Sequence, residues 1–329
     1  MRTGEPRPPD VSVVIPVHNG AQYVAQAIQS ALDQEGVRVE VIVVDDASTD
    51  TTSAVVAAFG DRVQYVALPK QTTSIATTTA GIALATGVLV GILHHDDYYL
   101  PGKLRRHVDV MRANSDVGLS YSAQHYVAPG GAHLWTLRSP VAHHDYVVPG
   151  VVELEHMMVQ NYLNFSNAIV RRSAYDAVGP YEEDLWFSAE WDMWTRLLMV
   201  SAVAYIDDPL VCYRLHPGSQ TFTGSRDTTA FLDQLQRVLD RIYGNPRLPP
   251  RLRTRRRLST ANMYLSTALL QSIRREWARA AFSAGRALRH VRPWEVPRLL
   301  RSSALVPRMG SRLRLSRSGT KLVPRDRQR

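Results

Sequence analysis

Short apolar runs alternate with segments of helical periodicity over the first 93 residues of the chain. Runs of β-branched residues predict buried strands, and apolar residues three or four positions apart predict helices. The predicted strands are residues 11–16, 39–44, 63–68 and 88–93, and the predicted helices are residues 23–34, 51–59 and 77–85. Strands that alternate with helices indicate right-handed crossovers in a mainly parallel sheet. The predicted fold class is therefore α/β, a mixed and mainly parallel sheet flanked by helices.

The pattern changes twice further along the chain. Residues 117–215 mix predicted strands (117–122, 167–170 and 210–213) with predicted helices (151–161 and 191–199). Beyond Gly224 the chain becomes helical and rich in arginine, with amphipathic helices predicted over residues 231–242, 258–273 and 277–288. We divide the chain into a flexible N-terminus (1–10), an α/β domain (11–222), a helical basic extension (223–307) and a mobile basic tail (308–329).

The charge changes sign at about the point where the helical, arginine-rich sequence begins. Residues 1–225 hold 14 of the 39 Lys and Arg and 24 of the 30 Asp and Glu, which gives a net charge of −10. Residues 226–329 hold the other 25 basic and 6 acidic residues, which gives a net charge of +19. The single cysteine, Cys212, excludes an intrachain disulfide and a cysteine-based zinc site, and it is typical of a reducing compartment. No apolar run approaches the length of roughly 20 residues that a membrane span needs. These features predict a cytoplasmic protein.

Two predicted strands end on paired carboxylates. The strand 88–93 is followed by His94, His95, Asp96 and Asp97. Adjacent carboxylates repel each other, but a divalent cation compensates their charge, and imidazole and carboxylate together suit Mn²⁺ or Mg²⁺. The alternative is that Asp96 or Asp97 caps a helix that begins near Pro101.

The strand 39–44 ends on Asp45 and Asp46, where a carboxylate can accept hydrogen bonds from a nucleotide. Here the alternative is capping and turn formation by Asp46, Ser48 and Asp50, with Ser48, Thr49 and Asp50 opening the helix that runs to Phe59.

These segments together resemble family 2 glycosyltransferases of the GT-A fold over roughly residues 10–222. The segments that carry the resemblance, in the family's order, are Val13–Asn19, Val43–Asp50, Gly81–Gly87 followed by Asp96–Asp97, Gly179–Tyr181 with Glu190–Arg196, and Tyr213–Ser219. The resemblance implies an inverting transfer of a sugar from a nucleotide diphosphate donor to a hydroxyl.

The resemblance also implies roles for individual residues. Asp46 would bind the base of the donor with support from Asp45 and the Pro16–Val17 backbone. Asp96 and Asp97 would hold the ribose and a Mn²⁺ or Mg²⁺ on the diphosphate. Glu190 would be the general base, with Asp192 as its substitute, although both are also favoured by the dipole at the start of a helix.

The segment Tyr213–Ser219 closes over the diphosphate in the family, which places Arg214 and His216 on that side of the site. His216 is a candidate metal ligand, and a strand-end ion pair is the alternative. Trp186 and Trp191 lie in the acceptor-side segment, where they either stack on a sugar or pack in the core.

Two positions depart from the family pattern. His94 stands where the family commonly has an acidic residue, which makes metal binding weaker and pH-dependent. Thr78 and Thr79 stand where the family often has Arg and Asn, and Lys70 is the candidate that restores the missing positive charge.

The predicted function is glycosyl transfer to a glycan or lipid-linked acceptor in the synthesis of a cell-surface polysaccharide or glycolipid. The alternatives are a non-catalytic scaffold with the same fold and a nucleotidyltransferase. The basic C-terminal helices carry Trp277 and Trp294, and we expect them to contact an anionic membrane surface on its inner face rather than nucleic acid, for which no recognition motif is present.

Overall fold

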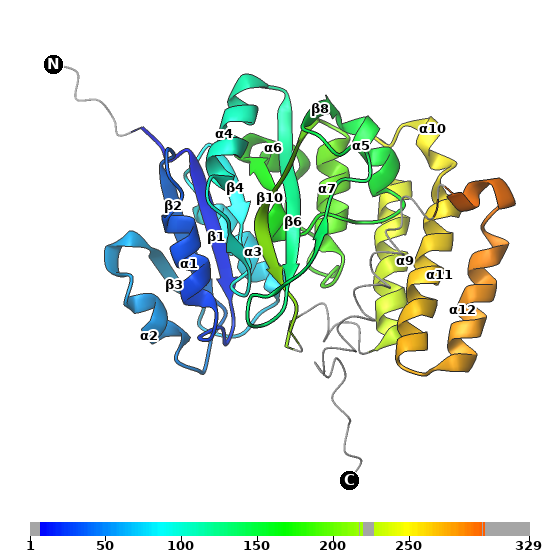
Figure 1. The fold of residues 1–329 in the computed structure, drawn as a ribbon, viewed down its shortest axis with the longest axis horizontal. Helices are drawn as coiled ribbons and strands as arrows, with labels where there is room; N and C mark the ends of the chain where they lie inside the picture. The colour runs from blue at the N-terminus through cyan, green and yellow to red at the C-terminus, as the bar shows by residue number, and fades with distance from the viewer. Residues whose placement is uncertain (1–6, 217, 220–226, 298, 300–329) are drawn as a thin grey trace, which may run out of the picture.

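The computed structural model describes residues 7–216, 218–219, 227–297 and 299. A ten-stranded mixed sheet forms the centre of this part of the chain, with the strand order β3-β2-β1-β4-β9-β6-β10-β5, while β7 pairs with β6 and β8 with β10 (Figure 1). The strands are β1 (Val11–Val17), β2 (Val39–Asp45), β3 (Gln64–Ala67), β4 (Leu89–Ile92), β5 (Tyr98–Tyr99), β6 (Val117–Val127), β7 (His133–Leu137), β8 (Tyr146–Pro149), β9 (Ile169–Arg171) and β10 (Ala202–Arg214).

The first four strands are parallel, as the sequence predicts. β1 lies between β2 and β4, with Val17 opposite Asp45 in the register. All seven residues of β1 are buried, because helices cover both faces of the sheet. Val13 and Ile15 belong to one apolar cluster and Val14 to the other, as the alternation of a strand requires. The carboxyl ends of these strands therefore meet at one edge of the sheet.

The helices of the α/β domain cover the sheet in two layers. Residues of α1, α2 and α4 pack in one apolar cluster, and residues of α3, α5, α6 and α7 pack in the other. These helices are α1 (Val24–Leu32), α2 (Thr52–Ala57), α3 (Ser74–Leu84), α4 (Lys103–Ala113), α5 (Gly150–Met157), α6 (Arg172–Val178) and α7 (Ala189–Leu198), with short 3₁₀ turns η1 (Gly60–Arg62) and η2 (Phe165–Asn167).

Several local predictions need correction. The strand predicted at 210–213 is the end of the 13-residue β10, whose register shifts around Pro209 hide its length in the sequence. The helix predicted over 151–161 ends at Met157. The helix predicted to run to Phe59 ends at Ala57; at its start, Asp50 Oδ1 accepts a 3.0 Å bond from the Thr52 amide. Strands β5, β7 and β8 and helix α6 were not predicted.

A helical layer follows the sheet. It contains α9 (Thr228–Gly244), α10 (Pro250–Arg253), α11 (Arg256–Ile273), α12 (Trp277–Arg289) and the turn η3 (Pro293–Glu295). Helix α9 packs on α7, α11 packs on α9, and α12 packs on α11 as the outermost helix of the three (Figure 1). None of the helices in the described ranges combines the length and apolar character needed to cross a bilayer. The predicted tail 308–329 and residues 1–6 of the predicted N-terminus lie outside the described residues.

Candidate active site

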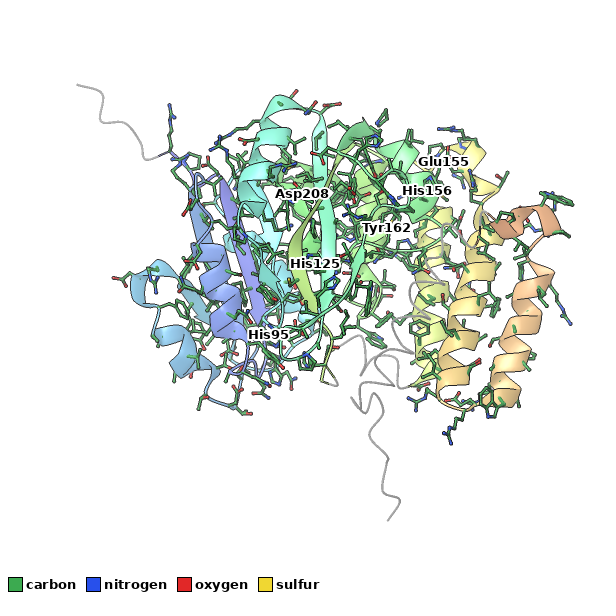
Figure 2. The ribbon with its side chains drawn as sticks, in the orientation of Figure 1. His95, His125, Glu155, His156, Tyr162 and Asp208 are labelled. Atoms are coloured by element: carbon green, nitrogen blue, oxygen red, sulfur yellow. The ribbon has the colours of Figure 1, made fainter. Side chains whose placement is uncertain are left out.

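The acidic residues that follow β2 and β4 lie at the same edge of the sheet. β1, β2 and β4 are parallel, so Asp45 and Asp46 at the end of β2 are brought to the side where His94–Asp97 follow β4. His95, at this lower edge in Figure 2, marks the site, and a Cβ on Gly20 would come within 2.5 Å of the His95 ring. The loop after β1 therefore packs directly on the loop after β4.

Asp45 and Asp46 are both buried but have different surroundings. Asp45 accepts bonds from the Ser48 amide at 2.9 Å and the Tyr65 hydroxyl at 2.6 Å, which use both of its oxygens. Within the described residues, Asp46 accepts side-chain hydrogen bonds on Oδ1 alone, from the amide (2.7 Å) and the hydroxyl (2.8 Å) of Thr72. Asp45 therefore supports the loop, while Oδ2 of Asp46 keeps its capacity to accept a bond from a ligand.

Three residues after β4 form a group with the chemistry of a metal site. One ligand atom each from His94, Asp96 and Asp97 can be chosen so that all three lie within 4.8 Å of one another. Burial lowers the pKa of His94, so its imidazole is neutral and able to act as a ligand at neutral pH. This donor set fits Mn²⁺ or Mg²⁺.

The two carboxylates of this group differ in their pKa. Burial opposes ionisation of Asp96, but the hydrogen bond from His216, with the imidazoles of His95 and His94 nearby, outweighs it and lowers the pKa to about 2. Burial and the charge of Asp96 raise the pKa of Asp97 well above its usual value. A cation bound between the two carboxylates would remove this conflict.

Asp97 is held in place from two directions. Its Oδ2 accepts a 2.5 Å bond from the Ser166 hydroxyl, and its Oδ1 accepts a 2.8 Å bond from the amide of Arg214. The alternative that Asp96 or Asp97 caps a helix is wrong, because β5 follows them directly and the residue before α4 is Gly102, with a positive φ of 79°.

Glu190 lies in the first turn of α7 and faces a different environment. Its Oε1 accepts a 3.0 Å bond from Nδ2 of Asn161, and the carboxylate also accepts the amide of Phe165. Burial nevertheless dominates and raises the pKa of Glu190 to about 8. A carboxyl group with a pKa in this range can take up a proton near neutral pH.

Phe165 and Ser166 are consecutive residues of η2, and they contact Glu190 and Asp97 respectively. One short turn therefore contacts both carboxylates. This places a group able to accept a proton next to a group able to bind a metal.

Residues 12–177, just over half of the chain, match the family model described as glycosyl transferase family 2. The chain belongs to this family. The succinoglycan biosynthesis protein ExoO of Rhizobium meliloti is 45% identical over 102 residues, which cover 31% of this chain and 29% of that protein.

Solved structures of glycosyltransferases share the GT-A fold with this chain. TarS 1-349 of S. aureus in complex with UDP-GlcNAc has a TM-score of 0.67 at 16% identity and covers 94% of this chain and 92% of its own. The mannosyltransferase PcManGT from Pyrobaculum calidifontis, in complex with GDP-Man and Mn²⁺, has a TM-score of 0.58 at 17% identity and covers 94% and 84%. The expected fold is confirmed.

Arg214 and His216 of this family 2 member contact the Asp96 side of the site. Arg214 is 3% exposed, and its guanidinium donates to the carbonyls of Asp96 (2.8 Å) and Pro129 (2.5 Å) and to Gln26 Oε1 (2.6 Å). His216 Nε2 lies 2.9 Å from Asp96 Oδ2 and outside the three-residue metal group. Both residues thus fix the segment around Asp96.

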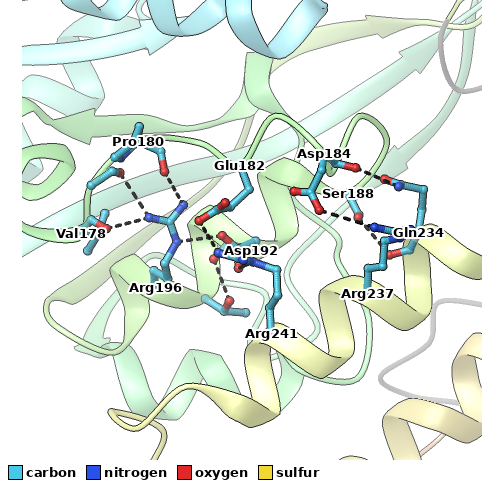
Figure 3. A network of polar contacts seen from close by, with 12 residues as sticks. Val178, Pro180, Glu182, Asp184, Ser188, Asp192, Arg196, Gln234, Arg237 and Arg241 are labelled. Carbon is cyan, nitrogen blue, oxygen red and sulfur yellow. Dashed lines mark hydrogen bonds and ion pairs between the residues drawn. The ribbon is translucent and has the colours of Figure 1, made fainter.

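Asp192 takes part in an ion-pair network (Figure 3). Its Oδ2 lies 2.8 Å from Nε of Arg196, and its Oδ1 lies 3.2 Å from Nε of Arg241 on α9. Both oxygens of this buried carboxylate are therefore engaged: Oδ2 pairs within α7, and Oδ1 joins α7 to the helical layer. The geometry favours Glu190 over Asp192 as the proton acceptor.

The remaining candidates lie in different surroundings. Trp191 is 3% exposed and donates its indole N–H to the Met157 carbonyl at 2.7 Å, so it packs in the core. Trp186 is half-buried, with its ring 5.7 Å from that of Phe187. Pro16 and Val17 are buried at the end of β1, and the Val17 carbonyl accepts the Asp46 amide at 2.8 Å. Lys70 is exposed on the loop after β3.

Sequence reasoning missed the neutral partners of the charged residues. Thr72, Asn161 and Ser166 position Asp46, Glu190 and Asp97, but each lies in a loop or turn far from its partner in sequence. One signal was available: the run Asn161 to Asn167 holds four polar residues between apolar ones. Such side chains are typical of turns and helix caps, so the sequence pattern alone does not indicate that they belong to an active site.

A buried lysine holds the η2 turn in place through a hydrogen bond. Nζ of Lys103 donates to the Asn167 carbonyl at 2.8 Å and lies 3.2 Å from His107 Nε2. Burial lowers the pKa of Lys103 to about 7. Asn164 caps the other end of the turn by accepting the amide of Asn167 at 3.0 Å.

Proposed function

We propose that the protein is an inverting glycosyltransferase that moves a sugar from a nucleoside diphosphate sugar to a hydroxyl of a glycan or lipid-linked acceptor. The observation that carries this proposal is the pair of contacts from Phe165 to Glu190 and from Ser166 to Asp97. A transfer of this kind needs a proton acceptor for the attacking hydroxyl and a charge-stabilising group for the leaving diphosphate, close together.

The donor would lie across the strand ends. Oδ2 of Asp46 is available for the base, Asp45 shapes the loop, and the Pro16–Val17 backbone ends β1 beside Asp46. Asp96 would contact the ribose. The donors in the related complexes, UDP-GlcNAc in TarS and GDP-Man in PcManGT, support this class of ligand. Exposed Lys70 is the proposed cation for the diphosphate.

His94, Asp96 and Asp97 would hold a divalent Mn²⁺ or Mg²⁺, with His216 orienting Asp96. When bound, such an ion stabilises the negative charge that develops on the leaving diphosphate. The neutral imidazole of His94 suits Mn²⁺, the ion named in the PcManGT complex.

Glu190 would remove the proton of the acceptor hydroxyl. The acceptor oxygen then forms a bond to the anomeric carbon while the bond from that carbon to the diphosphate oxygen breaks, and the nucleoside diphosphate leaves with the bonding electrons. Because attack comes from the face opposite to the leaving group, a single displacement inverts the anomeric configuration. Half-buried Trp186 is the proposed contact for the acceptor sugar.

The biological role we propose is the synthesis of a cell-surface polysaccharide or glycolipid. The identity to ExoO, a succinoglycan biosynthesis protein, over 102 residues supports this role.

The experiment is a titration of the full chain with UDP, GDP and dTDP by calorimetry, with Mn²⁺ and with EDTA, followed by product analysis with the matching sugar donors. We expect one nucleotide to bind in a Mn²⁺-dependent manner and its sugar donor to be consumed. Asp97→Asn should abolish the Mn²⁺ dependence, whereas Asp109→Asn, an exposed carboxylate on α4, should not. Absence of nucleotide binding with and without Mn²⁺ would overturn the proposal in favour of a non-catalytic scaffold.

A further inference from the structure

Helix α12 has an apolar face that points away from the protein. Its buried residues Ala280, Ser283 and Ala287 form the face that packs on α11. Trp277, Phe282 and Leu288 are 65%, 66% and 73% exposed. At 100° per residue, these three side chains fall within about 140° of one another on the side of the helix opposite Ser283. A helix that only packed on α11 would carry polar residues there.

The turn after the helix adds another exposed aromatic residue, and arginines accompany both segments. Trp294, in η3, is 72% exposed. Arg286 lies over the Phe282 ring at 5.8 Å, and Arg292 lies over the Trp294 ring at 5.5 Å. Among the described residues, the guanidinium groups of Arg286, Arg289 and Arg292 have no carboxylate within ion-pair distance. The Glu295 carboxylate accepts the backbone amide of Arg292 at 2.9 Å. We call Trp277, Phe282, Leu288 and Trp294 with these three arginines the α12 surface.

Charge decides between the possible occupants of the α12 surface. Residues 300–329 of this chain contain nine Lys and Arg and one acidic residue, so this segment would bring positive charge to positive charge. A second copy packed face to face would oppose the same arginines to one another. An anionic membrane surface offers both headgroup charge for the arginines and an apolar layer for the aromatic side chains.

We propose that the α12 surface docks on an anionic membrane, with Trp277, Phe282, Leu288 and Trp294 inserted at the headgroup boundary. Tryptophan side chains at both ends of the surface are typical of this position, because the indole ring is apolar and its N–H remains hydrated. Helix α12 lies at the end of the molecule away from β1 and β2 (Figure 1), so docking through it leaves the sheet edge with the donor site free. The inference is independent of which sugar the site transfers.

The test is co-sedimentation of the full chain with vesicles of phosphatidylcholine, alone and with 30% phosphatidylglycerol, at low and high salt. We expect binding to the anionic vesicles that falls at least tenfold in 1 M NaCl, with a blue shift of tryptophan fluorescence. The triple variant Trp277→Ser/Phe282→Ser/Leu288→Ser should lose at least tenfold in vesicle affinity. The matched control Val88→Ser/Val200→Ser replaces exposed apolar residues of the α/β domain and should bind as the parent does.

The variants also separate the other occupants from the membrane. Equal vesicle binding by the triple variant, or binding to neutral vesicles of the same strength, would overturn the proposal. A dimer in the parent that the triple variant dissolves would assign the surface to a second copy. If the triple variant loses much thermal stability without vesicles but still binds them, the α12 surface would be assigned to the basic segment 300–329 of the same chain. Nucleotide binding, measured in the same samples, should be unchanged, so a failure here is distinct from a failure of the catalytic proposal.

Discussion

Asn161 donates a 3.0 Å hydrogen bond to the carboxylate of Glu190, across 29 residues of sequence. The bond favours the charged carboxylate and lowers its pKa, while burial raises the pKa more strongly, to about 8. The pKa of Glu190 is therefore set by burial against the hydrogen bonds from Phe165 and Asn161, and the Asn161 bond can be removed by a substitution.

The transfer rate should depend on the ionisation of Glu190. Below about pH 8 the carboxyl is mostly protonated in the free enzyme, so kcat/KM should rise about tenfold per pH unit and become constant above this pH. Glu190→Gln should lower kcat by about 10²- to 10⁴-fold, the usual contribution of a general base, while nucleotide binding is retained. A pH-independent rate, or a Gln variant within a few-fold of the parent, would contradict this role.

Replacing Asn161 should move this pH profile. Asn161→Ala removes a hydrogen bond that favours the charged carboxylate, so the pKa of Glu190 should rise and the plateau of kcat/KM should shift to higher pH. At saturating pH the variant should approach the parent rate. Gln160→Ala is a matched control on the neighbouring residue, whose amide contacts the Asn161 carbonyl and Asn262 instead. A uniform loss of rate at every pH would indicate a role in packing rather than in ionisation.

Glu190 also links folding stability to pH. Its pKa is about 8 in the folded protein, against about 4.3 in an unfolded chain. The folded state therefore binds more protons between these values, and its stability falls as the pH rises through this window. Glu190→Gln removes the dependence, so its free energy of unfolding should exceed that of the parent by about 1–3 kcal/mol at pH 7 and by little at pH 4.5. Urea unfolding at both pH values measures the difference.

Asp97→Asn should separate metal binding from stability. The substitution removes the charge that burial and Asp96 disfavour, so the melting temperature in EDTA should stay equal to or above that of the parent. The increase in melting temperature that Mn²⁺ gives the parent should be lost, because one oxygen ligand is replaced by a weaker amide. A variant that melts earlier in EDTA but keeps its Mn²⁺ response would show that Asp97 acts in folding alone.

Asp192 should prove to be a structural residue. Asp192→Asn removes a charge that pairs with Arg196 and Arg241, and it should lower the free energy of unfolding by about 2 kcal/mol. At a temperature where the variant is folded, kcat should remain within a few-fold of the parent. A loss of kcat as large as that in Glu190→Gln would reassign the general base.

The fold of the first half could be predicted because each strand there is an uninterrupted apolar run. β1 is buried over its whole length and β2 over its last five residues, so apolar residues dominate both sequences. The second half is harder to predict, since β7 and β8 lie in the outer part of the sheet and their residues are exposed or half-buried. The 13 residues of β10 include Asp207, Asp208 and Pro209, which sequence patterns assign to a turn.

The charged members of the site were predictable, and their contacts were not. Asp46, Asp97 and Glu190 occur in short motifs that can be read from the sequence. Their hydrogen-bond partners are distant in the sequence and are brought to them only by folding. Asp192 and Glu190 are two residues apart in one helix, and only the family resemblance favours Glu190 at the level of the sequence. The structure separates them because α7 presents Asp192 to Arg241 of α9 and Glu190 to Asn161.

The η2 turn contacts both carboxylates to which the proposed reaction assigns a role. Ser166 fixes the residue proposed to bind metal, Phe165 contacts the residue proposed to accept the proton, and Asn167 rests on the ammonium group of Lys103. A displacement of this turn by a fraction of an ångström would move both carboxylates together. A ligand that shifts Asp97 would therefore act on Glu190 through the same three residues, with no contact of its own to that carboxylate.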